Sequence, residues 1–290
     1  MPAWEDVNVF DVRKGEKVGE WHVPGGREEV VKICAAPRRS SGKRSTDGGD
    51  EDEQDDEEDE DTDDEKIFAV AYADGSIRVW ASSFPNSSSS EGFSNQAYEI
   101  VTFNGHKKSP TALTFSSSGD LLFSGGVEGE IVVWDVLGEV GLFRLKGHRG
   151  GVSGIKYLPH PDNATDRTST KAGFLISTSK DGMMKLWDLD TRHCLQTVVV
   201  GRGEVFSLDI KQSVDSNDGF ESMKEDEGAS RVMGRWTILT GSGNGDVRVW
   251  EVTYDNLRSG IKEDSEGNVS TDRLFGTKST FKLMCNGFRL

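Results

Sequence analysis

Two sets of histidine, serine and acidic residues are spaced in a similar order along the chain. In the first set, His106 lies 18 residues before Ser124, and Glu128 lies four residues after that serine. A second set repeats the order with His148, Ser177 and Asp181. These are the residue types of a hydrolytic triad, in which the histidine takes the serine proton and the carboxylate orients the histidine. Because a tryptophan follows each acid by six residues, the repetition favours a structural role.

Four tryptophans mark a repeat that extends beyond these two sets. Each ends an alternating apolar run (IRVW, IVVW, MKLW or VRVW): Trp80, Trp134, Trp187 and Trp250. Such alternation is typical of half-buried β-strands. The intervals are 54, 53 and 63 residues, whereas a WD40 repeat of a β-propeller has roughly 40 to 45 residues. Polar insertions account for the excess, so the sequence predicts an all-β fold of WD40 blades with enlarged loops.

A WD40 blade explains why the polar residues recur. The histidine, the hydroxyl, the turn acid and the tryptophan form one hydrogen-bonded chain, because buried polar groups need partners. We expect two complete networks: His106, Ser124, Glu128 and Trp134, then His148, Ser177, Asp181 and Trp187. Two others are partial: Thr240, Asn244 and Trp250 with Arg202 in place of the histidine, and Asp74 and Trp80 with Val70 in place of the hydroxyl residue.

No other constellation in the sequence indicates catalysis. His193 adjoins Cys194 without a third partner, and the glycines between Gly241 and Gly245 do not precede a helix, as a phosphate-binding loop would. The three cysteines are widely separated and form neither a zinc motif nor a disulfide framework. We therefore predict a protein that is not an enzyme and has no cofactor, no metal site and no small-molecule substrate.

The blade boundaries follow from the repeat. Residues 1–22 supply the last two strands of an incomplete blade, and 253–290 form an irregular tail. The predicted blades are 29–103, with a disordered acidic insert at 38–65; 105–145; 147–199; and 205–252, with an insert at 213–235. Closure of a propeller takes about four to eight blades. We expect a partial, open propeller whose exposed apolar blade faces cause self-association.

The net charge of −16 comes almost entirely from one segment. Asp47 to Glu65 contains 15 acidic residues and no basic residue, so the rest of the chain has a formal net charge of −1. Such a run is expected to be disordered and self-repelling. It serves as a solubilising loop or, alternatively, docks onto basic protein or competes with nucleic acid. No apolar run approaches the roughly 18 residues of a membrane span, so no membrane partner is expected.

Two groups of basic residues are candidates for nucleic-acid contact. Just before the acidic run lie Arg38, Arg39, Lys43 and Arg44. They suit a nuclear-import signal or RNA phosphate contacts, and the alternative is a solvated loop. The second group flanks the Gly-His corners and would form a positive rim: Lys107, Lys108, Lys146 and Arg149.

The segments around the repeat marks resemble one particular family. VFDVRKGEKV, AVAYADGSIRVW, VTFNGH, VVWDVLGEVGLFRLKGH, LWDLDTRHCLQTVVVGRGEV and VRVWEV are similar to the first propeller of the U-three-associated protein twelve family. That family is also called Dip-two or WD repeat-containing protein three. The resemblance covers about Val7 to Val252 apart from the inserts. It departs at Arg202, where the family has histidine, and after Thr271.

The resemblance implies a non-catalytic scaffold of the nucleus and nucleolus, a UtpB-type subunit of the small-subunit processome. Its implied partners are other processome WD-repeat proteins, pre-rRNA and small nucleolar RNA, contacted within a snoRNP-containing complex during 18S rRNA maturation. Family members carry a second propeller and a helical C-terminal domain, so we expect a fragment of a longer protein. The alternative is a WD40 adaptor outside the nucleolus, such as a ubiquitin-ligase substrate receptor, since fold alone does not choose between them.

Overall fold

A computed structural model of the chain describes residues 6–11, 16–22, 29–37, 65–83, 97–160, 171–213, 235–253, 261–263, 269–271 and 276–282. Every helix or strand assigned in these ranges is a β-strand, and they contain no helix long and apolar enough to cross a membrane. The all-β class predicted from the sequence is confirmed. Residues 38–64 of the predicted acidic insert lie outside the described ranges.

The described strands form four antiparallel four-stranded sheets and two strand pairs. Sheet I contains β3 (Val30–Ala35), β4 (Glu65–Tyr72), β5 (Ser76–Ser83) and β6 (Ala97–Asn104). Sheet II contains β7 (Pro110–Phe115), β8 (Leu121–Gly126), β9 (Ile131–Asp135) and β10 (Val140–Leu145). Sheet III contains β11 (Val152–Leu158), β12 (Phe174–Ser179), β13 (Met183–Asp188) and β14 (His193–Val199). Sheet IV contains β15 (Val205–Ser213), β16 (Arg235–Ser242), β17 (Asp246–Thr253) and β20 (Gly276–Lys282). The pairs are β1 (Asp6–Asp11) with β2 (Glu16–His22), and β18 (Ile261–Glu263) with β19 (Val269–Thr271).

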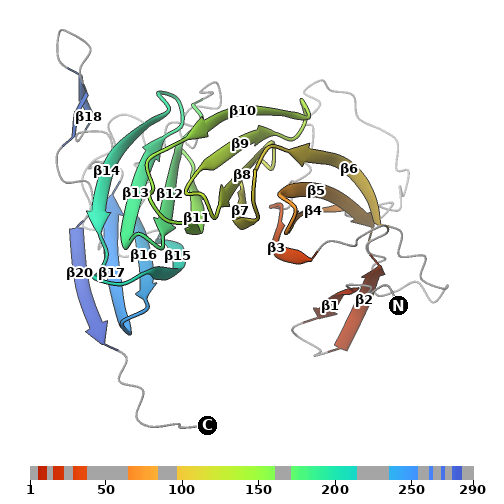
Figure 1. Ribbon diagram of the computed structural model, residues 1–290, viewed down its shortest axis with the longest axis horizontal. Helices are drawn as coiled ribbons and strands as arrows, with labels where there is room; N and C mark the ends of the chain where they lie inside the picture. The colour runs from red at the N-terminus through yellow and green to blue at the C-terminus, as the bar shows by residue number, and fades with distance from the viewer. Residues whose placement is uncertain are drawn as a thin grey trace, which may run out of the picture.

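The four sheets follow one another around an arc in chain order (Figure 1). Their first strands are innermost, and β7 contacts β3 on one side and β11 on the other, while β11 contacts β15. This is the arrangement of propeller blades, in which each sheet packs its face on the next. Among the described residues the arc does not close, as its open lower side in Figure 1 shows.

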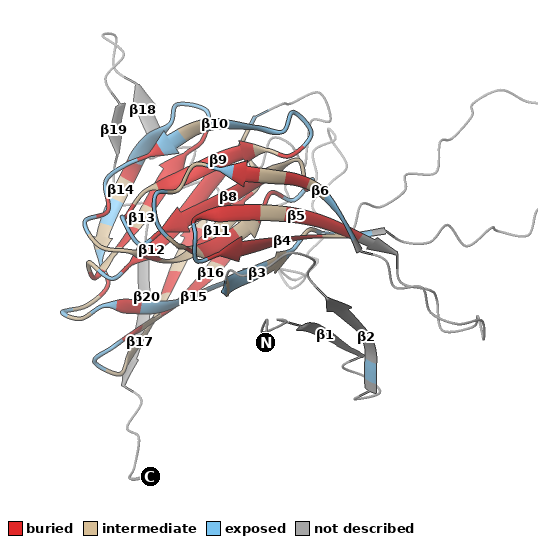
Figure 2. Ribbon diagram, turned by 45° about the vertical axis from the view of Figure 1, so that its right-hand side comes forward, coloured by how far each residue is buried: buried red, intermediate tan, exposed pale blue. Residues whose placement is uncertain are grey.

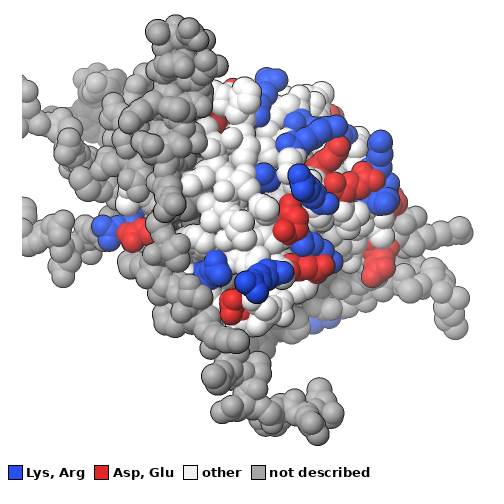
Figure 3. All heavy atoms as spheres, turned by 60° about the vertical axis from the view of Figure 1, so that its left-hand side comes forward, with Lys and Arg blue, Asp and Glu red and all other residues white. Residues whose placement is uncertain are grey.

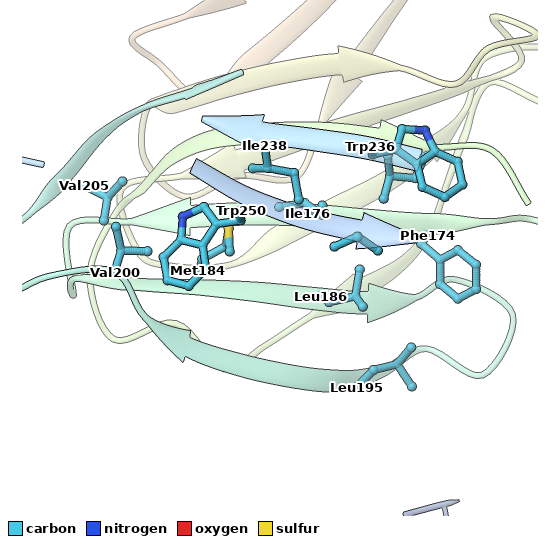
Figure 4. Packing of buried hydrophobic residues seen from close by; sticks show 12 residues of the cluster. Phe174, Ile176, Met184, Leu186, Leu195, Val200, Val205, Trp236, Ile238 and Trp250 are labelled. Carbon is cyan, nitrogen blue, oxygen red and sulfur yellow. The ribbon is translucent and has the colours of Figure 1, made fainter. Parts of the chain in front are cut away.

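The core consists of three apolar clusters, one in each space between consecutive sheets. Buried residues run through the middle strands, whereas the outer strands β10 and β14 carry many exposed ones (Figure 2). Between sheets III and IV, Ile176 and Met184 meet Ile238 and Trp250 (Figure 4). Each such side chain contributes about 1.5–3 kcal/mol by leaving water. The apolar side chains of the middle strands therefore hold consecutive sheets face to face.

In each of the first three sheets, the turn between the second and third strands contacts the loop that leads into the next sheet. Gly129 adopts a φ of 80°, and a Cβ there would lie 2.7 Å from the carbonyl oxygen of His148. Gly75 repeats this arrangement with a φ of 97° and the carbonyl oxygen of His106 at 2.6 Å. Glycine alone combines the left-handed backbone with so close an approach. These turns bring each Gly-His corner onto the preceding sheet.

The tail 253–290, which the sequence predicts to be irregular, supplies a regular strand to sheet IV. β20 pairs antiparallel with β17, with Val249 opposite Ser279 and Val247 opposite Phe281. Its sequence, GTKSTFK, lacks sustained apolar alternation. The strand pairs through backbone N–H and C=O groups, which every residue type offers, so the sequence does not mark the pairing. An outer strand of this kind is defined by its partner, so pattern reading missed it.

Candidate functional site: polar networks and a central groove

Sheet III contains a continuous network between the loop before β11 and the turn after β12. The imidazole Nδ1 of His148 lies 3.0 Å from Oδ2 of Asp181, and its Nε2 lies 2.8 Å from Oγ of Ser177. The indole Nε1–H of Trp187 donates to the same Oγ at 2.8 Å. Because a carboxylate only accepts, Nδ1 carries the proton, and the Ser177 hydroxyl donates to Nε2. The four predicted residues therefore lie in one chain.

Charge in this network is governed by burial. Burial lowers the pKa of His148, and the neighbouring Asp181 carboxylate only partly opposes that shift. For Asp181, burial would raise the pKa, but the backbone N–H of Arg149, at 2.9 Å, and the His148 imidazole outweigh it and lower the pKa. The stable state at neutral pH is thus a neutral histidine held by an ionised aspartate.

Sheet II has the same inner part of the network and a different outer part. His106 Nε2 lies 2.7 Å from Oγ of Ser124, which accepts a hydrogen bond from Trp134 Nε1–H at 2.7 Å. Glu128 is exposed, and no described contact joins it to His106. Burial, together with the charge of Arg144, lowers the pKa of His106 to about 4. Three of the four predicted residues are brought together, and Glu128 is not.

Glu130, two residues beyond the predicted turn acid, is the carboxylate with described basic partners in sheet II. Its two oxygens each lie 3.0 Å from a basic side chain, Arg144 on one side and Lys146 on the other. Arg144 in turn donates to the carbonyl oxygen of Gly105. The sequence analysis did not identify Glu130. The segment Glu128-Gly129-Glu130 contains two acidic residues near the turn, and only the first was predicted as the turn acid.

The two partial networks differ from each other. In sheet IV, Trp250 Nε1–H donates to Thr240 Oγ1 at 2.9 Å, while Asn244 bonds to Ser242 and Asp246 in its own turn. Arg202 is exposed, and no described contact joins it to Thr240.

In sheet I, Asp74 accepts hydrogen bonds from the backbone and the hydroxyl of Ser76. Val70 occupies the hydroxyl position, and the buried Nε1 of Trp80 has no hydrogen-bond partner. The loss of the hydroxyl at Val70 thus leaves a buried donor unsatisfied.

Accessibility argues against catalysis at these residues. Ser124 and Ser177 are fully buried, and each hydroxyl is already held by a tryptophan and a histidine. A nucleophile must reach a substrate atom, and neither hydroxyl can. The networks position the sheets.

A groove runs along the inner strands and is the concave surface of the described part of the molecule. It contains cavities of about 380 Å³ and 260 Å³, which share Thr114 and Lys156 in their walls. The larger cavity is lined by residues of β3, β7, β11 and β15. Lys156 of sheet III donates from its Nζ to Oδ1 of Asp209 in sheet IV at 2.9 Å, and so links the two sheets. Four strands distant in sequence converge here, so no local pattern announced it.

The residues of the predicted positive rim are exposed, and the charge on the described surface is mixed. Lys107, Lys108, Lys146 and Arg149 are all exposed. Lys146 is paired with Glu130, and on the face shown in Figure 3 basic and acidic residues are interspersed. The other basic cluster, Arg38, Arg39, Lys43 and Arg44, lies outside the described residues. Within the described ranges, no three His, Cys, Asp or Glu side chains are placed to hold a metal ion.

Sheet architecture and networks together define the class of protein. The WD domain, G-beta repeat family matches residues 98–135 and 140–188. The first match covers the last strand of sheet I and the first three strands of sheet II, and the second covers the last strand of sheet II and the first three strands of sheet III. The chain therefore contains WD40 repeats, and such repeats typically form non-catalytic scaffolds.

Particular relatives share different parts of the chain. U3 small nucleolar RNA-associated protein 12 of Saccharomyces cerevisiae is 29% identical over 214 residues, which is 73% of this chain and 18% of that protein. The COMPASS component SWD3 of the same organism is 30% identical over 99 residues, 34% of this chain and 28% of that protein. The chain thus spans less than a third of the length of either relative. A chain in the crystal structure of the mitotic checkpoint complex superposes with a TM-score of 0.55 at 14% identity, covering 97% of this chain and 61% of that one, and shows the fold alone.

Proposed function

We propose that the protein is a non-catalytic scaffold in ribosome biogenesis, acting as a UtpB-type subunit of the small-subunit processome in the nucleolus. The observation that carries the proposal is the similarity to U3 small nucleolar RNA-associated protein 12, which extends over 73% of this chain. The similarity to COMPASS component SWD3 covers 34%. Other WD40 proteins match up to 62% of this chain, at 24% identity, so the proposal rests on the combination of extent and identity in this one relative.

The geometry suits a scaffold that works through surface contacts. Its polar residues hold the blades, and the surfaces free for partners are the central groove, the rims and the outer strands. Other processome WD-repeat proteins, pre-rRNA and small nucleolar RNA are the proposed partners. RNA contact within the complex would use the basic residues Arg38, Arg39, Lys43 and Arg44, because phosphate binding requires positive charge.

Localisation and co-purification test the proposal. Tagged protein expressed in cells is expected in the nucleolus, with U3 small nucleolar RNA and processome proteins in the purified complex. A cytoplasmic protein that co-purifies with ubiquitin-ligase subunits would instead support the adaptor alternative and reject the proposal.

A charge variant provides a matched comparison for nuclear entry and RNA contact. Replacing Arg38, Arg39, Lys43 and Arg44 by glutamine should reduce nuclear entry or RNA recovery without changing the melting temperature of the purified protein. The control replaces the exposed residues Lys180 and Lys211, which belong to neither candidate group, in the same way. Equal effects of the two variants would remove the basic cluster from the proposed contacts.

A further inference from the structure

Three large apolar side chains are exposed close together in the hairpin formed by β9 and β10 of sheet II. Leu137 is 68% exposed, Val140 50% and Leu142 45%, and they fall within six consecutive positions of the chain. β10 lies on the outer side of the arc, and no described strand pairs with its free edge (Figure 1). These three residues, together with that free edge, are called the outer patch below.

The corresponding hairpin of sheet III shows that the turn itself does not require exposed apolar residues. Both turns have four residues, and both end on a residue with a positive φ, 56° in sheet II and 64° in sheet III. At the positions of Leu137 and Val140, the hairpin of sheet III carries Asp190 and His193, which are polar and exposed. The apolar side chains of sheet II therefore have no role in forming the hairpin.

The third residue of the outer patch occupies a β-bulge that recurs in the outer strands. The bulge residue is Ile100 in sheet I, Leu142 in sheet II and Leu195 in sheet III. Ile100 packs against the cluster between sheets I and II, and Leu195 belongs to the cluster between sheets III and IV. Leu142 belongs to none of the three clusters of described residues. Clustered exposed apolar side chains indicate a surface that another molecule covers.

The charges at the two ends of β10 have opposite signs. Glu139 immediately precedes the strand, whereas Arg144 and Lys146 lie at its other end. Both basic side chains pair with the single carboxylate of Glu130, so one positive charge is in excess at that end. When two such strands run antiparallel, the acidic end of each lies beside the basic end of the other. The charge pattern of β10 is thus complementary to a second copy of itself.

We propose that two copies of this chain associate through the outer patch, with their β10 strands antiparallel. A two-fold axis between Leu142 and Phe143 places Glu139 of each copy beside the partner's Lys146, because a two-fold contact uses the same residues from both sides. Val140 and Leu142 of both copies then leave water together. Blades of one propeller pack face to face, so a further blade of the same chain would not cover this outer edge. The inference goes beyond the proposed place in ribosome biogenesis and does not depend on it.

Sedimentation velocity of the full chain over a range of concentrations tests the proposal, and a reversible dimer is expected. The double variant Leu137→Asp, Val140→His copies the polar residues of the sheet III hairpin. It should weaken the dimer about tenfold or more, since apolar burial is lost from both copies, and leave the melting temperature unchanged. The matched control is Val199→Asp, because Val199 is 59% exposed on the outer strand of sheet III. A monomer at every concentration, or a dimer that the hairpin variant does not weaken, overturns the proposal.

Charge reversal tests the antiparallel arrangement. Glu139→Lys and Lys146→Glu should each weaken the dimer about tenfold, because each places like charges together at both symmetric contacts. Mixing the two variants should restore the affinity of the original chain, because both contacts of the mixed pair then join a lysine to a glutamate. Co-sedimentation of one labelled variant with the other measures this. An effect of either variant on its own fold would not be reversed by mixing, so a mixture that stays weak overturns the arrangement.

Discussion

Sheets II and III contain the same histidine, serine and tryptophan, but they differ in the acid. Asp181 is short enough to lie beside His148 in the turn, and it accepts from the backbone N–H of Arg149 and of Met183 as well. Glu128, one methylene longer, is exposed at the equivalent place. His148 is therefore held through both ring nitrogens, whereas the described contacts hold His106 through Nε2 only.

The difference teaches which part of the network a blade needs. The tryptophan indole is satisfied in both sheets by the serine hydroxyl alone. The acid adds a link between the Gly-His corner and the turn, because it bonds to both. Burial of the tryptophan is nearly the same in all four sheets, between 2% and 4% exposed. Packing sets where the indole lies, and the hydroxyl satisfies its N–H.

Removal of the shared hydroxyl should have the largest effect. Ser177→Ala leaves Trp187 Nε1–H and His148 Nε2 buried without a partner, at a cost of about 2–4 kcal/mol of unfolding free energy. Urea unfolding followed by tryptophan fluorescence measures it. Ser177→Thr is the control, because Thr240 fills the same role in sheet IV. A loss below about 1 kcal/mol in the alanine variant would show that the network adds little.

Acidification should act mainly through sheet II. The pKa of His106 is about 4 in the folded protein and near 6.5 when unfolded, so below pH 6.5 the unfolded chain binds a proton that the folded chain does not. Unfolding free energy should fall between pH 6.5 and 4, by up to about 3 kcal/mol. The depressed pKa of His148 contributes in the same direction. His106→Gln should flatten the pH profile measured by urea unfolding, and an unchanged slope would contradict the assignment.

Truncation of the acids tests the comparison directly. Asp181→Ala removes the partner of His148 Nδ1–H and of two backbone N–H groups, so it should cost about 1–2 kcal/mol. Glu128→Ala should change stability by about 0.5 kcal/mol or less, as surface substitutions do. Both are read from thermal and urea unfolding. Equal losses would mean that Glu128 has a role its exposed position does not indicate.

The smallest expected effect is a gain in sheet I. Val70→Thr places a hydroxyl where Trp80 Nε1–H lacks an acceptor, and should raise stability by about 0.5–1 kcal/mol. Val70→Ala is the control, since it removes volume without adding an acceptor and should destabilise. A destabilised threonine variant would indicate that its hydroxyl does not reach the indole.

Prediction from sequence succeeded for the tryptophan and serine pairs, because their spacing along paired strands fixes which side chains meet. The spacing of Trp134 and Trp187 from the serines predicted a hydrogen bond in each sheet, and both bonds are present. It failed for Glu128, which is exposed and makes no described contact with His106. It failed also for β20, whose pairing with β17 uses backbone groups common to all residues. The groove at Lys156 could not be foreseen, because its walls come from four separate sheets.

The sequence by itself determined the repeating unit: apolar alternation, the Gly-His corners and the tryptophans impose four-stranded sheets, because local periodicity and buried polar groups admit few other arrangements. The tertiary structure decided how far each copy of a repeat position is buried. Leu239 and Phe123 occupy the same position of the repeat, yet one is 43% exposed and the other fully buried. The reason is that burial depends on the neighbouring sheet and is not encoded at the position itself.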